Sequence, residues 1–394
     1  MWFSKELKLG KPTCENPYPT LFPCPRDFAA PSPKKRRSVS KEIFGDTNEK
    51  PTLDGKQFTK HISTCQVDQF TQGNLDLHVA LQFHHIQRES CVRVFTGLPS
   101  PEVFEKIFSW IEVKAKHMQY WKGEKATLAP VAYTHQVNSE ARYGPSRSPT
   151  LEQEFLLVLM RLRKGLLVED LAFRFKITRS QVSCIFTTWI KLLSRELGIS
   201  IVWPSKTQVK KTMPCCFRKM YPKCRVIIDC TEVYTETPTA LDIAAALWSD
   251  YKQHHTFKFL VAITPRGAVS WVSPVYGGRA SDVHIVRDSG FLNNIQRYDL
   301  VMADRGFKIM EDLLAIGSNL AIPPSSAASM QMRSKDVKET SQIANVRIHV
   351  ERAIRRIKIF RILKQEIPLC IVPLADDIVR VYAALSNLSE PLVV

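Results

Sequence analysis

Three acidic residues lie in settings where a carboxylate could do chemistry. Asp229 falls in the middle of the apolar, β-rich run 225–234, where an ionised side chain is costly unless something compensates for its desolvation. Asp304 directly follows a second apolar run, and Glu351 lies on a helix expected over 341–363. A strand centre, a strand end and a neighbouring helix can bring three carboxylates to one point. Such a cluster of oxygen ligands suits Mg²⁺ or Mn²⁺.

Two divalent ions held in this way could carry out a phosphodiester displacement. One would activate a water or a 3′-hydroxyl, and the other would stabilise the leaving oxygen. Taken singly, however, each acid also has a structural explanation. Asp229 could accept backbone or hydroxyl hydrogen bonds, for example from Thr231, and Asp304, two residues before Gly306, could form a cap or a turn. We therefore assign Asp229, Asp304 and Glu351 as catalytic metal ligands on the strength of their combination.

Basic residues crowd the expected helix around Glu351, on the faces outside its apolar stripe. They are Arg347, Arg352, Arg355, Arg356, Lys358 and Arg361. Glu351 could form ion pairs with the arginines four residues away on either side, or the whole run could be a solvated face. So many positive charges beside one acid repel one another unless an anion is near. We therefore predict that Arg352, Arg355 and Arg356 contact DNA.

The charge balance of the whole chain also favours a polyanionic partner. The 394 residues include 55 Lys and Arg against 38 Asp and Glu, a formal charge of +17. A membrane is the rival partner, but no apolar run approaches the roughly 18 residues of a membrane span. The N-terminus lacks the apolar core of a signal peptide, and the ten cysteines are scattered, as in reduced compartments. Pro-Lys-Lys-Arg-Arg at 33–37 fits a nuclear-import signal, so we predict the nucleus, with a solvated charge run as the alternative.

Three helical patterns between 149 and 200 resemble a helix-turn-helix. The first ends at Gly165, the second repeats apolar residues at i, i+3, i+4 and i+7 from Val168, and the third opens with a capping box. A short helix, a tight turn and a longer helix are typical of this DNA-binding motif. Its polar residues near the start of the third helix are predicted to contact DNA, with a small helical bundle as the alternative. They are Arg179, Ser180, Gln181, Ser183 and Thr187.

The chain is too long for one ordinary core, so we expect two folded units and linkers. Residues 1–90 are predicted to be a disordered basic region, and 91–148 a helical segment with a linker. The helix-turn-helix at 149–200 precedes a catalytic domain at 215–385. Strand-like runs there alternate with helical connections, which predicts the α/β class, with a mixed sheet flanked by helices. These runs are 225–234, 257–264, 268–275, 299–303 and 320–322.

Several segments together resemble the DDE superfamily endonuclease domain of Harbinger-type transposases. In order along the chain they are Leu-Ala-Phe-Arg-Phe at 171–175, Ser-Gln-Val-Ser at 180–183, Val-Ile-Ile-Asp-Cys-Thr-Glu at 226–232, Tyr-Lys at 251–252, Thr-Phe-Lys-Phe-Leu at 256–260, Gly-Gly-Arg-Ala-Ser-Asp at 277–282, Ala-Asp-Arg-Gly-Phe at 303–307 and Arg-Ile-His-Val-Glu-Arg at 347–352. The resemblance extends over about 91–385. It implies an RNase H-like fold in which Asp229, Asp304 and Glu351 hold two Mg²⁺ or Mn²⁺ ions, with Asp282 as a supporting acid.

The resemblance also implies a function and partners. The expected activity is that of a metal-dependent DNA nuclease or transposase, which cleaves phosphodiester bonds and can also join them. The alternative is a domesticated, transposase-derived DNA-binding protein with a regulatory role. Double-stranded DNA is the expected partner. The resemblance also suggests a separate DNA-binding accessory protein and a homo-oligomer as further partners. No membrane partner is expected.

Overall fold

The computed structural model describes residues 80–121, 148–323 and 334–393. All of them belong to the first of the two units into which the chain divides. The basic run at 33–37, the predicted disorder of 1–79 and the predicted linker over 122–147 lie outside the described residues. Among the helices that the structure describes, none is long and apolar enough to cross a membrane.

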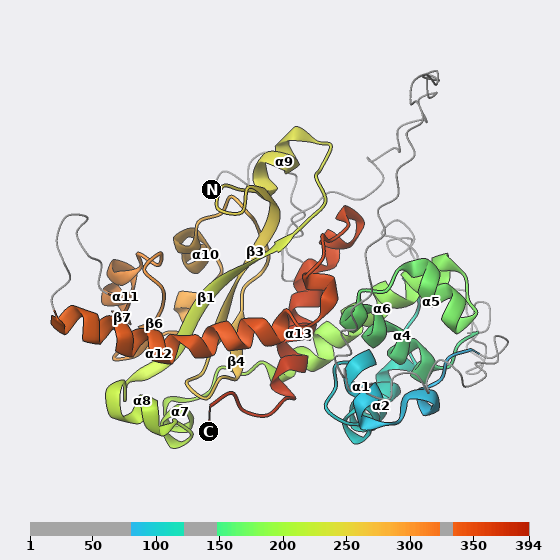
Figure 1. The fold of residues 1–394 in the computed structure, drawn as a ribbon, viewed down its shortest axis with the longest axis horizontal. Helices are drawn as coiled ribbons and strands as arrows, with labels where there is room; N and C mark the ends of the chain where they lie inside the picture. The colour runs from blue at the N-terminus through green and yellow to red at the C-terminus, as the bar shows by residue number, and fades with distance from the viewer. Residues whose placement is uncertain (1–79, 122–147, 324–333, 394) are drawn as a thin grey trace, which may run out of the picture. The chain divides into compact units, whose positions relative to one another are not determined.

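A mixed sheet forms the centre of the C-terminal region, as predicted (Figure 1). Its long strands β1 (Cys224–Tyr234) and β3 (His254–Ile263) are antiparallel. On its other side β1 runs parallel to β6 (Leu300–Met302), which is parallel to β7 (Asn319–Ala321). Three short strands pair with β3, and these are β2 (Trp248–Ser249), β4 (Val269–Val272) and β5 (Tyr276–Gly277). The α/β class expected from the sequence is confirmed.

Side chains alternate between the two faces of this sheet, and each face has its own hydrophobic core. Ile227 and Val233 of β1 pack in the core that includes α12 (Ser334–Ile357) and α13 (Ala375–Asn387). Val226 and Ile228, in contrast, pack in a second core with α10 (Asp282–Asp288) and α11 (Met310–Ile316). The face that a residue occupies on β1 therefore decides which helices it can meet.

The sequence misplaced the ends of the long helix α12. It was predicted over 341–363 but spans Ser334–Ile357. Phe360 keeps the apolar period because its ring stacks on Tyr382, with 4.4 Å between centroids. Its backbone, however, is extended and precedes the 3-10 turn η6 (Arg361–Leu363). A side chain can stay buried after the helix has ended, so the periodicity of apolar residues does not show where the helical backbone stops.

The predicted helix-turn-helix is present as α4 (Leu151–Lys164), α5 (Val168–Phe175) and α6 (Arg179–Leu197). Gly165 ends α4 in the left-handed conformation, with φ of 66°, where a residue without a Cβ is favoured. Thr178 and Gln181 form the predicted capping box of α6. The helix then buries an apolar face, which includes Val182, Ile185, Phe186 and Trp189.

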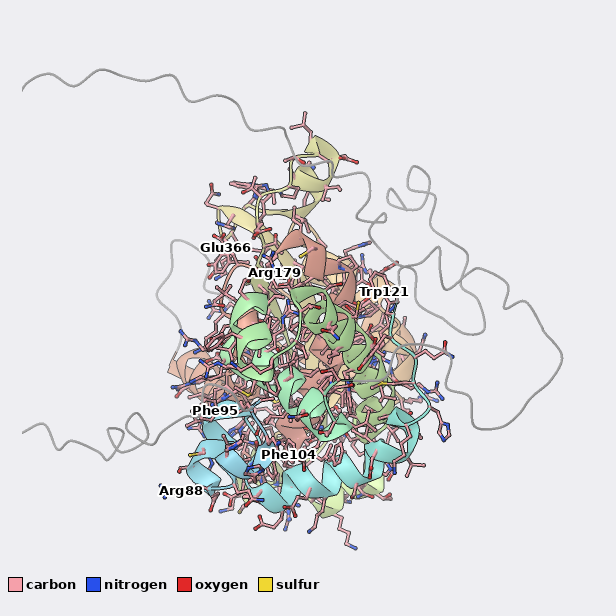
Figure 2. The ribbon with its side chains drawn as sticks, turned by 90° about the vertical axis from the view of Figure 1, so that its right-hand side faces the viewer. Arg88, Phe95, Phe104, Trp121, Arg179 and Glu366 are labelled. Carbon is pink, nitrogen blue, oxygen red and sulfur yellow. The ribbon has the colours of Figure 1, made fainter. Side chains whose placement is uncertain are left out.

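Helical structure begins before the predicted boundary near 90. The 3-10 turn η3 (Phe83–Ile86) precedes α1 (Glu89–Phe95) and α2 (Pro101–Ala115). Phe83 is buried and stacks on Phe104, with 3.8 Å between ring centroids; Phe104 is labelled in Figure 2. The disorder predicted through residue 90 is thus wrong at its end, because two apolar residues are too few to produce a visible period.

The remaining elements connect these parts. The helices are α7 (Lys206–Lys211), α8 (Cys215–Met220) and α9 (Leu241–Leu247). The 3-10 turns are η4 (Gly198–Ser200), η5 (Phe291–Asn294) and η7 (Leu369–Leu374).

Candidate active site

Asp229 and Asp304 lie level with each other on neighbouring parts of the sheet. The parallel register pairs Ile227 of β1 with Met302 of β6; Asp229 follows two residues later within β1, and Asp304 lies two residues beyond the end of β6. Ala303 still donates its backbone N–H to Ala321, at 3.1 Å, so sheet-like bonding continues to the residue before Asp304. Asp229 at the strand centre and Asp304 at the strand end, recognised separately in the sequence, therefore lie next to each other in the fold.

Arg347 of α12 stands beside these two carboxylates. By strand alternation Asp229 lies on the same face as Ile227, the face that α12 covers. Arg347 donates from Nη1 to Asp304 Oδ1 at 3.3 Å, and its side chain is only 12% exposed. Asp304 Oδ1 also accepts the backbone N–H of Arg305 at 2.7 Å, so the turn-forming role considered for Asp304 is present as well.

The setting of Asp229 disfavours its charged form. Burial raises the pKa of the Asp229 carboxyl to about 6; the charge of Arg347 opposes this rise, whereas the charges of Asp304 and Asp282 add to it. No hydrogen bond joins Asp229 to Thr231 among the residues described, but a backbone hydrogen bond from Cys230 lowers the pKa of Asp229, so the structural alternative is realised in part. A carboxylate whose charged form is disfavoured by burial and by neighbouring acids is one that a cation would stabilise.

Glu351 lies on α12 one turn beyond Arg347, so the two residues share a side of the helix. It is exposed, and within the described part of the chain it forms no ion pair with Arg347 or Arg355. The alternative of a structural ion pair is thus not realised. Across the described ranges, however, no three acidic, His or Cys side chains stand close enough together to hold a metal ion. Asp229 and Asp304 are brought together, and Glu351 is placed nearby on the covering helix.

Asp282 lies at the start of α10, on the other face of the sheet from α12. Ser281, and not Asp282, caps that helix by accepting the N–H of His284. Asp282 instead pairs with Lys258 of β3, 3.1 Å from Oδ1 to Nζ. Its other oxygen lies 3.5 Å from where a Cβ on Gly306 would stand, so it contacts the turn that follows Asp304. Its supporting role stays a prediction.

Lys258 was not recognised from the sequence. Its Nζ also lies 3.3 Å from Glu232 Oε1, and Glu232 faces Lys258 across the β1–β3 register. Glu232, three positions from Asp229 along β1, is on the opposite side of the strand. The available signal was a lysine within the buried run Phe-Lys-Phe-Leu at 257–260, a position where a charge requires partners.

The basic residues predicted to contact DNA on α12 fall into two groups. Arg352 and Arg355 are exposed and form no ion pair within the part of the chain described. Arg356 is half-buried and donates from Nη1 to the carbonyl of Glu390. Lys358, just after the helix, donates to the carbonyl of Glu232 at 2.8 Å. Arg352 and Arg355 are therefore available to an anion, whereas Arg356 is already bound within the protein.

The predicted DNA-contacting side chains of α6 lie at its exposed start, where Figure 2 labels Arg179. Arg179, Ser180, Gln181 and Ser183 are exposed, and Thr187 is half-buried. Several already have internal partners. Arg179 pairs with Glu169 at 3.2 Å, Ser183 donates to the carbonyl of Arg179, and Gln181 accepts the backbone N–H of Thr178. The surface is open to a ligand, but DNA binding would have to replace these internal hydrogen bonds and the ion pair.

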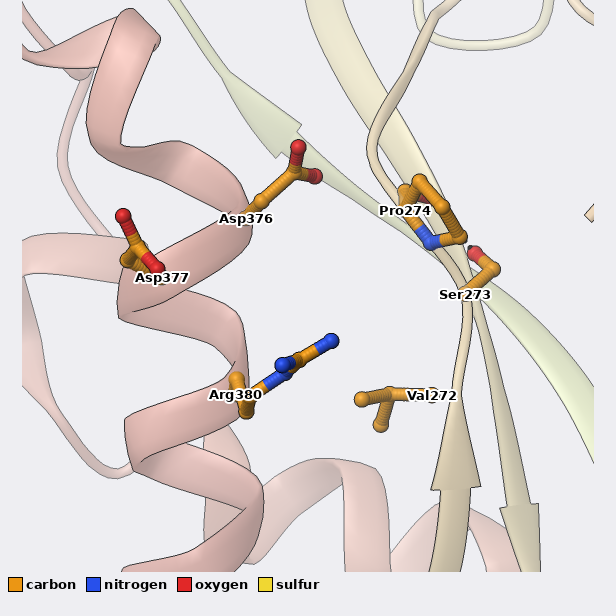
Figure 3. Close-up of a pocket in the computed structure, with 6 residues that line it drawn as sticks. All are labelled: Val272, Ser273, Pro274, Asp376, Asp377 and Arg380. Atoms are coloured by element: carbon orange, nitrogen blue, oxygen red, sulfur yellow. Dashed lines mark hydrogen bonds between the residues drawn. The ribbon is translucent and has the colours of Figure 1, made fainter. Parts of the chain in front are cut away.

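A pocket elsewhere contains none of the predicted site residues. Figure 3 shows it between α13 and the segment after β4, lined by Val272, Ser273, Pro274, Asp376, Asp377 and Arg380. Asp376 Oδ1 accepts the N–H of Val275 at 2.6 Å. Burial raises the pKa of Asp376 to about 6. These contacts join α13 to the sheet, so we assign the acid a structural role.

Comparison with protein families agrees with this arrangement. Residues 228–387 match the family described as DDE superfamily endonuclease, a span that includes Asp229, Asp304 and Glu351. Residues 150–199 match the helix-turn-helix of DDE superfamily endonuclease, which corresponds to α4, α5 and α6. No curated protein and no solved structure matched the chain. The chain thus carries a DDE superfamily endonuclease domain preceded by the helix-turn-helix of that superfamily.

Proposed function

We propose that the protein is a transposase-like DNA endonuclease of the Harbinger type, which cleaves and also joins phosphodiester bonds in double-stranded DNA. The observation that carries the proposal is the placement of Asp229 in β1 level with Asp304, just beyond the end of the parallel strand β6, beneath the helix that bears Glu351. Burial of Asp229 and its repulsion by Asp304 make the charged form of Asp229 costly for the fold alone. A function that uses both charges explains why they are together.

Asp229, Asp304 and Glu351 would hold the divalent metal. Their carboxylate oxygens are the ligand type that Mg²⁺ and Mn²⁺ prefer, so the donor chemistry fits. When bound, a pair of such ions supplies activation of the attacking oxygen and stabilisation of the leaving oxygen. Asp282, held by Lys258 at 3.1 Å, would keep the turn after Asp304 in place.

The basic surfaces would hold the DNA. Arg352 and Arg355 project from the same helix as Glu351, so phosphates bound there would lie next to the acids. The helix-turn-helix would bind through Arg179, Ser180, Gln181, Ser183 and Thr187 at the start of α6. Arg356 would contribute less than its neighbours because it already binds the Glu390 carbonyl.

The test is a nicking assay on supercoiled DNA with Mn²⁺ or Mg²⁺. Asp229→Asn, Asp304→Asn and Glu351→Gln are each expected to lower cleavage by about a hundredfold or more while DNA binding is retained. Asp242→Asn is the control, because Asp242 is an exposed acid on α9 outside the proposed site. Cleavage by the three variants at the rate of the parent would refute the assignment.

A domesticated DNA-binding protein with a regulatory role is the second candidate. It is favoured by the absence, within the described ranges, of a three-ligand cluster ready to hold a metal. The two functions separate in the same assay, since a regulatory relative would bind DNA at the parent's affinity but leave it intact with either metal.

The location and the partners are proposals of the same kind. The basic run at 33–37 supports action in the nucleus. A homo-oligomer or a separate DNA-binding accessory protein would be detected by light scattering and by co-purification with DNA.

A further inference from the structure

Arg347 contributes a positive charge to a place where two negative charges meet. Its Nη1 lies 3.3 Å from Asp304 Oδ1. Among the charged groups that act on Asp229, Arg347 has the largest effect, and it favours the ionised form. Arg347 is therefore the cation that these contacts place next to the two carboxylates.

We propose that Arg347 is a positioning residue that occupies the cation site between Asp229 and Asp304 and must be displaced from it when a divalent ion binds. This inference rests on the proposed function, since it presumes that the two acids are metal ligands. It identifies Arg347 as an internal competitor that sets how much free metal the site requires.

The contacts of Arg347 are those of a group that can leave. A strong arginine–carboxylate bridge is bidentate and short, with two N–H donors on two oxygens. Here only Nη1 bonds Asp304, and at 3.3 Å. Arg347 Nε is buried and, among the described residues, has no hydrogen-bond partner. A buried donor without an acceptor destabilises this position of the side chain. The pairing is therefore poor enough for a doubly charged ion to replace it.

The position on α12 also gives the displaced side chain an alternative partner. Glu351 lies four residues on, along the same side of the helix, and Arg352 and Arg355 form the exposed basic surface beyond it. A guanidinium released from Asp304 is within one helical turn of the surface where DNA phosphates are proposed to bind. Metal entry would thus add a positive group to the DNA-binding surface.

The test is the affinity of the full-length protein for Mn²⁺, measured by calorimetry in the absence of DNA. Arg347→Met keeps the apolar stem and removes the charge. It is expected to tighten Mn²⁺ binding by at least about tenfold, because one positive charge next to the ion is lost. Arg355→Met is the matched control, since Arg355 lies four residues from Glu351 on the other side and does not contact Asp304. It should change Mn²⁺ affinity by less than about threefold.

A second measurement addresses the pairing without metal. In EDTA, Arg347→Met is introduced into the parent and into the Asp304→Asn variant. It is expected to lower the urea midpoint more in the parent, because the Asp304→Asn variant already lacks the charge that pairs with Arg347. If the parent binds Mn²⁺ and Arg347→Met binds it equally or more weakly, the inference is wrong while the proposed function stands. If neither protein binds Mn²⁺, the proposed function fails, and the inference fails with it.

Discussion

Replacing Asp229 by Asn is expected to stabilise the metal-free protein. The pKa of the Asp229 carboxyl rises from an ordinary 3.8 to about 6 on folding, first because of burial. One unit of pKa difference between two states corresponds to about 1.4 kcal/mol, so the ionised carboxylate costs the folded protein at most about 3 kcal/mol. An amide has the same shape and no charge. It still requires hydrogen bonds, and its incomplete bonding offsets about 1 kcal/mol of the gain. The net increase in unfolding free energy should be about 1–2 kcal/mol at pH 7.5.

The sign of the pH dependence follows from the same shift. The folded pKa exceeds the unfolded one, so between about pH 4 and pH 6 the folded state binds more protons than the unfolded state. The parent therefore loses stability as the pH rises through this window, and the loss is complete above it. Asp229→Asn lacks this titration, and its bonding penalty does not change with pH, so its net advantage over the parent should be about a third as large at pH 5 as at pH 7.5.

Urea denaturation in EDTA at these two pH values measures the effect. Asp242→Asn serves as the control, because Asp242 is exposed and its replacement should leave the midpoint within error. The comparison with the parent cancels contributions from other buried acids such as Asp376. A variant that is no more stable than the parent at pH 7.5, or whose advantage does not grow with pH, would show that Asp229 is not strained by burial.

Two further predictions concern the helix-turn-helix. Trp189→Phe removes the Nε1 donor, 2.7 Å from the fully buried Glu154 carboxylate, and should lower the unfolding free energy by about 1.5–3 kcal/mol. Urea melts measure this, with Trp110→Phe, a residue 47% exposed, as a control that should change little. Arg179→Ala should weaken DNA binding and reduce the slope of log affinity against log salt by about one. Titrations at several salt concentrations test this, and an unchanged slope would mean that Arg179 does not contact a phosphate.

Much of the local structure was predictable from the sequence because the signals are short-range. The Thr178–Gln181 capping box and the left-handed Gly165 depend on residues within one helical turn, and both are present where expected. The β1 run was recognised from its apolar composition to within one residue of its start. The end of α12 was not, because Phe360 stays buried against Tyr382 after the helix has ended.

The sequence by itself determined the types of the site residues and the elements that carry them. Asp229 in a strand, Asp304 at a strand end and Glu351 on a basic helix follow from composition and periodicity within each segment. Only the tertiary structure decided what these residues meet. The parallel β1–β6 register made Asp229 and Asp304 neighbours, and the packing of α12 set Arg347 against Asp304 and left Glu351 exposed. Strand pairing and helix docking join residues that are 43 positions or more apart, as Arg347 and Asp304 are, and no local pattern encodes which partner each will find.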